Sequence, residues 1–214
     1  MKRAFTLLEL VFVIVIVGIL AATMIPRTND DSLARAAIQL QSHIRYTQHL
    51  AMVDDQFNPI DGNWYKKRWQ IIFSKQNSSA DKWAYTIFSD KNSGSSGRPN
   101  ETEIAWNPLH NDQRMTGGYN SAQDLNVSNP NFIGMKSMNL GLSYGITNMS
   151  FSCYQRLSFD YLGRPIKSDL SSNDEAYDSN DLIKDYCDIN LSNSSGTATV
   201  RVYAQTGYVQ VIFQ

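Results

Sequence analysis

The feature that most constrains this chain is an almost uninterrupted apolar run at residues 5–25. Its length matches the roughly 20 residues that a helix needs to cross the hydrocarbon core of a bilayer. Lys2 and Arg3 precede the run, so the positive-inside rule leaves the N-terminus cytoplasmic and the bulk of the chain outside. A secretory signal peptide fits poorly, because the run is too long and no small-residue cleavage site follows a short apolar core. The pattern predicts a single-pass membrane anchor.

Glu9 lies inside this run. A carboxylate at mid-membrane costs about 2.5–3.5 kcal/mol, and such residues usually have a partner. One interpretation places Glu9 one turn from the helix start, where headgroups and the helix dipole stabilise its charge. The other interpretation gives the carboxylate a function inside the membrane. The residues around Glu9 are compatible with both interpretations.

The segment at residues 4–10, AFTLLEL, resembles the processing site of type IV prepilins and type II secretion pseudopilins. The resemblance implies that residues 1–4 are a leader, which prepilin peptidase removes by cutting between Ala4 and Phe5 before methylating the new N-terminus. It also implies that Glu9 pairs with the N-terminal amine of a neighbouring subunit, so that two charges in lipid neutralise each other. Family members usually have glycine where this chain has Ala4.

A second helix is predicted to follow as a stem over residues 26–55. Pro26 ends the apolar run, because proline removes a backbone donor and clashes with the preceding turn. In pilin-like proteins a proline at this point loosens the helix and belongs to the assembly segment. Residues 29–32 are good cap and first-turn residues for a restarted helix. An apolar stripe typical of one helix face then follows at Leu33, Ala37, Leu40, Ile44 and Ala51.

Residues 56–214 are predicted to form a β-rich head, because the periodicity changes from 3.6 to 2. Aromatic and β-branched residues predict strands at residues 68–73, 83–88, 146–153, 155–159, 164–167, 187–191, 197–204 and 208–213. The last two read as a hairpin around Gly207. Residues 90–138 show little periodicity and form either an ordered insertion held by Trp106, Tyr119 and Phe132 or a mobile flap. Of the two, we expect partial order.

Two segments of the head resemble H-type (GspH/FimT-like) minor pseudopilins. They are residues 157–165, LSFDYLGRP, and the final hairpin at residues 198–211. The stem at residues 35–52 is also similar, whereas the middle of the chain is not. The resemblance implies a pilin-like α+β fold, in which a long N-terminal helix, combining transmembrane segment and stem, packs on antiparallel β-sheets.

The two cysteines, Cys153 and Cys187, both fall in the polar part of the chain. In a cytosolic protein they would be unpaired small hydrophobes. In an exported protein a disulfide is expected, and it would stabilise the fold by roughly 2–4 kcal/mol. Because the anchor predicts export, we expect the Cys153–Cys187 disulfide.

The sequence shows no catalytic pattern, so no enzyme activity and no cofactor are expected. His43 and His49 lie six residues apart on different helix faces, and His110 is alone in the insertion, so none forms a metal site. Catalytic serine, cysteine–histidine and phosphate-loop motifs are missing from the sequence. The acidic residues 169–188 could alternatively bind Ca²⁺, but their spacing does not match an EF-hand and favours a solvated loop.

Two further patterns give weaker hypotheses. Lys66, Lys67 and Arg68 lie among aromatic residues, which could grip single-stranded nucleic acid or simply begin a strand. Some FimT-like proteins bind DNA through a basic C-terminal tail, but residues 209–214 contain no Lys or Arg, so nucleic acid is not an expected partner. Asn126 and Asn190 resemble the acidic-x-Asn-x-Ser acceptor of bacterial N-glycosylation.

Together these patterns predict a minor pilin or pseudopilin in the inner membrane, with a cytoplasmic N-terminus and a periplasmic head. Its expected partners are other pilins or pseudopilins, prepilin peptidase, the inner-membrane assembly platform and membrane lipid. It would assemble through its N-terminal helix into a filament of a type II secretion or type IV pilus system. The alternatives are a DNA-uptake pilin whose head contacts DNA and a signal-anchored periplasmic domain of unknown activity. Net charge is only −1, so the whole chain exerts no general attraction on nucleic acid.

Overall fold

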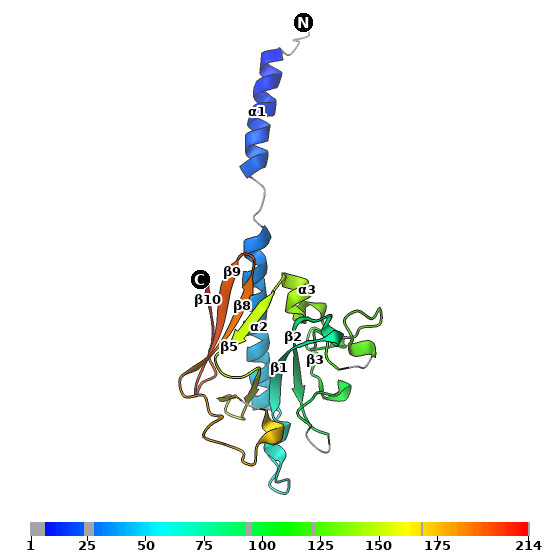
Figure 1. Cartoon of the computed structure of the whole chain (residues 1–214), viewed down its shortest axis with the longest axis vertical. Helices are drawn as coiled ribbons and strands as arrows, with labels where there is room; N and C mark the ends of the chain where they lie inside the picture. The colour runs from blue at the N-terminus through cyan, green and yellow to red at the C-terminus, as the bar shows by residue number, and fades with distance from the viewer. Residues whose placement is uncertain (1–6, 24–27, 93–95, 121–122, 168, 214) are drawn as a thin grey trace.

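The computed structural model describes residues 7–23, 28–92, 96–120, 123–167 and 169–213. It has an apolar helix, a long stem helix and a head of antiparallel sheets that lie along the stem (Figure 1). The α+β architecture agrees with the predicted pilin-like arrangement. Ala4, Phe5 and Pro26 lie outside the described residues.

The apolar helix α1 spans Leu7–Thr23. Of the predicted span at residues 5–25, residues 5–6 and 24–25 lie outside the described residues. Within the described ranges, no helix reaches the length and hydropathy that crossing a membrane requires.

The stem helix α2 spans Thr28–Val53, close to the predicted residues 26–55. Its five predicted stripe residues are all buried, from Leu33 at 7% exposure to Leu40 and Ile44 at 0%. Ala36 and Thr47 are fully buried as well, and Thr47 donates its hydroxyl to the His43 carbonyl of the preceding turn. The helix packs on both sheets of the head, so its buried face forms the centre of the core.

The head contains two four-stranded antiparallel sheets. The first has the order β2-β1-β6-β7, and the second has the order β10-β9-β8-β5. The strands are β1 (Trp69–Gln76), β2 (Lys82–Ser89), β5 (Asn148–Phe151), β6 (Arg156–Phe159), β7 (Pro165–Ile166), β8 (Tyr186–Asn193), β9 (Gly196–Tyr203) and β10 (Val209–Phe213). All eight predicted strands are confirmed, with small shifts at their ends.

The C-terminal hairpin is also confirmed. Strands β9 and β10 pair from Val202–Val209 to Ala198–Phe213. The turn between them contains Gly207 with a φ of +61°, a left-handed conformation that glycine adopts without steric cost. The alternation of strand β9 buries Ala198, Val200 and Val202 against the stem.

A disulfide joins Cys153, in the loop between β5 and β6, to Cys187 in β8. Cys187 is buried at 1% exposure within the main core. The loop that carries Cys153 is the connection from the second sheet to the first, so the bridge fixes this crossing to the middle of the second sheet.

The insertion at residues 90–138 is more ordered than its composition predicts. It contains the hairpin of β3 (Trp106–Asn107) and β4 (His110–Arg114). Its backbone continues the first sheet beyond β2, because Met115 accepts from the Ile87 amide and Gly117 donates to the Tyr85 carbonyl. Short helical turns complete the chain, namely α3 (Leu140–Tyr144) and the 3₁₀ segments Trp64–Lys67, Asn77–Ser79, Glu101–Glu103, Gln123–Leu125, Lys136–Met138 and Leu170–Ser172.

The three aromatic residues expected to hold the insertion differ in burial. Tyr119 is buried, Phe132 is half-buried and Trp106 is 48% exposed. The Trp106 ring instead stacks on the Arg114 guanidinium, whose centre lies 3.5 Å from the ring centroid. A small second core of Phe88, Ile104 and Leu125 anchors the insertion to β2.

Candidate assembly helix and head surfaces

Helix α1 presents apolar side chains on every side. The side chains of residues 7–20 are all exposed, from 82% at Leu7 to 46% at Val11, and the described part of the head covers none of them. A helix that is apolar all round is normally buried in protein or lipid. Glu9 lies in its first turn, where the helix dipole favours a negative charge. This surface therefore needs a cover that the described residues do not supply.

Gln48 of the stem joins the two head segments that carry the H-type resemblance. Its side-chain Nε2 donates to the carbonyls of Gly163 and Thr206, each at 2.8 Å. Gly163 has a φ of +79°, and a side chain at this position or at Gly207 would collide with the Gln48 amide. Both turns thus need glycine for conformation and for close approach to the stem.

Asp160 explains the Asp-x-x-Gly-Arg pattern of the turn between β6 and β7. Its carboxylate is buried and accepts from the backbone amides of Leu162 and Arg164. It also pairs with the Arg164 Nε at 2.7 Å. These three donors compensate the burial of the charge and hold the turn in the shape that Gln48 contacts.

The stem also holds the final hairpin through polar contacts. Gln41 Nε2 and Arg45 Nη2 both donate to the carbonyl of Val209, at 2.8 and 2.9 Å. Arg45 also lies over the ring of Tyr208, 5.8 Å from its centroid. The stem helix therefore positions both head segments that resemble H-type pseudopilins, residues 157–165 and residues 198–211.

His43 lies at the contact of the stem with the first sheet. Its Nδ1 is 2.7 Å from the hydroxyl of Tyr85, which accepts from Gln39 Nε2 at 2.8 Å. Because the Tyr85 hydroxyl accepts from Gln39, it can donate its proton to a neutral His43 ring. Burial lowers the pKa of His43 from 6.5 to about 4, since the charged ring would lose its hydration.

We expect acid to weaken this contact. The pKa of His43 is lowered on folding. The stability that the neutral ring contributes to the fold is therefore present above pH 6.5 and is lost as pH falls toward 4. Between pH 6.5 and 5 the loss amounts to about 2 kcal/mol. Urea unfolding of the wild type and of His43→Gln at pH 7 and pH 5 measures it as the difference between the two proteins. Asp90 changes the stability in the opposite direction, because burial raises its pKa to about 6 and its protonation on acidification favours the folded state. Both proteins contain Asp90, so its effect cancels in the difference between them. Equal pH dependence in the two proteins would refute the assignment.

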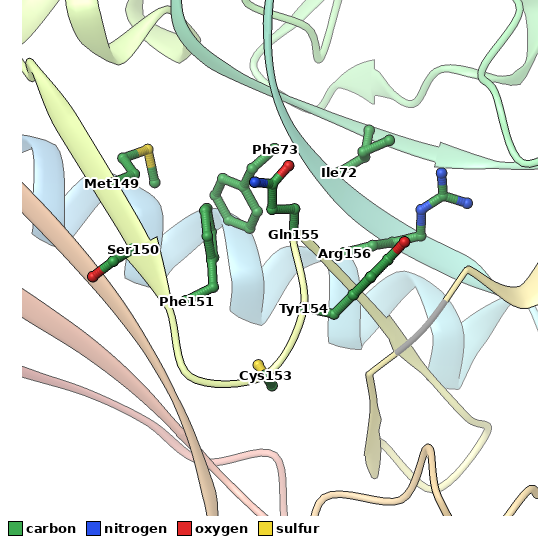
Figure 2. A pocket seen from close by; sticks show the side chains of 9 residues that line it. All are labelled: Ile72, Phe73, Met149, Ser150, Phe151, Cys153, Tyr154, Gln155 and Arg156. Atoms are coloured by element: carbon green, nitrogen blue, oxygen red, sulfur yellow. The ribbon is translucent and has the colours of Figure 1, made fainter.

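A cleft of about 460 Å³ lies where the two sheets separate, between β1 and β5. Figure 2 shows Phe73, Phe151 and Gln155 close together in it, with Cys153 on the loop below. The rings of Phe73 and Phe151 are 5.2 Å apart at their centroids. β5 is an edge strand of the second sheet, and only one of its two edges pairs with β8. Its other edge faces the cleft.

Residues 1–25 match a family model described as a prokaryotic N-terminal methylation motif. The chain carries the type IV prepilin-like signal. The match ends before the stem, so it is silent on the head and on H-type specificity. No curated protein and no solved structure matches the chain.

In this prepilin-like chain the predicted nucleic-acid residues make contacts within the head. Lys66 Nζ donates to the Ser171 carbonyl, and Lys67 pairs with Asp61 at 2.7 Å. Arg68 is buried at 4% exposure and donates to the Ala176 carbonyl at 2.7 Å. Arg68 therefore cannot offer its guanidinium to a surface ligand, and the geometry of this segment does not favour the DNA-contact hypothesis.

The acidic stretch at residues 169–188 is likewise engaged with neighbouring residues. Asp169 pairs with Arg156 at 2.6 Å, Asp188 pairs with Arg201 at 2.7 Å, and Asp181 accepts from Asn173. No group of three His, Cys, Asp or Glu residues in the described ranges is placed to hold a metal ion.

The remaining predicted residues are separate from one another. His49 and His110 are exposed on α2 and β4. The amide nitrogen of Asn190 donates to the Ser150 hydroxyl and its oxygen accepts from Thr199, within the second sheet. Asn126 lies in the insertion, where its oxygen accepts from the Ser128 amide. Of the two acceptor patterns, only Asn126 lies in a loop.

Proposed function

We propose that this chain is a minor pilin or pseudopilin subunit and not an enzyme. Prepilin peptidase removes residues 1–4 and methylates Phe5. The mature N-terminal helix anchors the subunit in the inner membrane, with the head in the periplasm. It then bundles with the same helix of neighbouring pilins as the assembly platform builds a filament of a type II secretion or type IV pilus system.

One observation carries this proposal, namely that the methylation motif contains a helix that is apolar on every side. A prepilin-like signal explains both features, because lipid covers the helix before assembly and other subunits cover it afterwards. The stem supports the same function, since α2 carries both sheets and links them to α1 in sequence. The Cys153–Cys187 disulfide fits an oxidising compartment outside the cytoplasm.

The N-terminus of the membrane-extracted protein tests the proposal. We expect mass spectrometry to show a chain that begins at Phe5 and carries one added methyl group. Ala4→Gly, which restores the usual family residue, is expected to be processed at least as completely. Ala4→Arg is expected to block the cut, because a bulky charged residue precedes the scissile bond. A wild-type chain that keeps Met1 in a host with active prepilin peptidase would overturn the proposal.

A further inference from the structure

The insertion and the outer face of the first sheet enclose a second and larger cleft of about 1100 Å³. Ile72 of β1 and Arg156 of β6 line it from the sheet. From the insertion it is lined by Ser96, Arg98, Asn100, Tyr119, Asn120 and Asn126. It meets the cleft of Figure 2, since Ile72 and Arg156 line both. The two clefts thus adjoin at Ile72 and Arg156.

The lining of the larger cleft is unusually rich in carboxamides. They belong to Gln76, Asn77, Asn100, Asn120 and Asn126. The side-chain oxygens of Gln76, Asn100 and Asn126 accept from nearby backbone amides within the head. A lining of carboxamides is polar and uncharged, which suits a ligand that carries many hydroxyl groups. Small-molecule pockets are mostly apolar and hold about 300–1,000 Å³, so this cleft differs from them in its polar lining and is similar in size to the largest of them.

Arginine gives the cleft a positive charge. Arg156 is buried at 5% exposure, donates to Asp169 and to the Gly97 carbonyl at 2.6 Å each, and keeps a buried Nε without a partner. Arg98 also lines the cleft and is exposed, and none of the ion pairs of the described residues involves it. Two guanidinium groups against one carboxylate leave an excess cation at the rim. Ser78, also on the lining, adds a buried hydroxyl without a partner.

We propose that this cleft binds an acidic oligosaccharide, a chain of hydroxyl-rich rings that carry carboxylates. The carboxamides bind the ring hydroxyls, and Arg98 pairs with a carboxylate. The exposed ring of Tyr154, which lines the adjoining cleft, offers an apolar face for a further sugar ring. This inference concerns the head alone and does not depend on filament assembly.

Calorimetric titration of the full chain with tetragalacturonate tests the proposal, in a detergent that has no sugar headgroup. We expect tetragalacturonate to bind more tightly than the neutral cellotetraose. Arg98→Gln should weaken the binding of tetragalacturonate about 10-fold or more, because it removes a charged hydrogen bond. It should leave the binding of cellotetraose unchanged. Asn77→Ala should weaken the binding of both sugars about 2- to 10-fold, because it removes a hydrogen bond from an uncharged side chain. Both side chains are exposed, so these variants should fold, which circular dichroism checks.

Lys136→Gln is the matched control, since it removes an exposed positive charge that does not line the cleft. It should leave tetragalacturonate binding unchanged. Equal weakening by Lys136→Gln and Arg98→Gln would overturn the site, because general charge attraction would then explain binding. Tetraglutamate binding as tightly as tetragalacturonate would overturn the carbohydrate class in favour of an acidic peptide. Absence of binding heat with all three probes would overturn the proposal entirely.

Discussion

Replacing Glu9 with valine is expected to reduce incorporation into filaments at least about tenfold while the head folds normally. If Glu9 pairs with the N-terminal amine of a neighbouring subunit, the variant leaves that ammonium in lipid without a counter-charge. Breaking a buried ion pair by removing one partner costs about 3–5 kcal/mol, and each 1.4 kcal/mol is a tenfold change in an equilibrium. The measurement is the fraction of subunit recovered in sheared filaments relative to the membrane fraction.

Glu9→Asp is the matched variant for this experiment. It keeps the charge and shortens the side chain, so incorporation should fall less than in Glu9→Val. Processing at Phe5 should be equal in both, which separates assembly from cleavage. Wild-type levels of Glu9→Val in filaments would show that the carboxylate has no part in docking and that the helix dipole alone explains its position.

Removing the disulfide is expected to destabilise the head by about 2–4 kcal/mol, because a cross-link restricts the unfolded chain. The bridge spans 34 residues and fixes the crossing between the two sheets to β8. Denaturant unfolding of the Cys153→Ala/Cys187→Ala double variant measures the loss. A reductant should lower the stability of the wild type by a similar amount and leave the double variant unchanged. A double variant as stable as the wild type would mean that core packing alone fixes this crossing.

Local periodicity predicted most of the secondary structure. The stem stripe at Leu33, Leu40 and Ile44 has the period of a helix face, and it is buried as expected. The eight strands each carry β-branched or aromatic residues, most densely in β1, β2, β9 and β10, so their positions follow from short-range pattern. In contrast, β4 reads His-Asn-Asp-Gln-Arg and has no apolar alternation, which is why the insertion hairpin could not be predicted.

Long-range arrangement was beyond the sequence pattern. Strand β1 pairs with β6, which follows it by more than 80 residues, and the intervening segment gives no signal for this pairing. Likewise, Arg68 lies among basic and aromatic residues that suggest a surface patch, yet its guanidinium is buried between Trp64 and Tyr177. The larger cleft collects side chains from five separate segments, so only the folded chain brings them together.

The Gln48 contacts illustrate how a motif and its cause can differ. The pattern around Asp160 and Gly163 resembles a family signature in sequence, and the hairpin at Gly207 resembles another. In the folded chain the two patterns meet at one contact, because the Gln48 amide donates to both turns. Each glycine is required by that shared contact as well as by its own turn.

The stem also has a mechanical consequence. The two sheets are separate hydrogen-bonded units, and α2 packs on both. Tension that reaches the head through the N-terminal helix would therefore load both sheets in parallel, by shear along the helix rather than by peeling one sheet from the other. The stem residues would yield as a group, because Leu33 to Ala51 share one buried face. A head built in this way transmits a pull along its long axis with little change of shape.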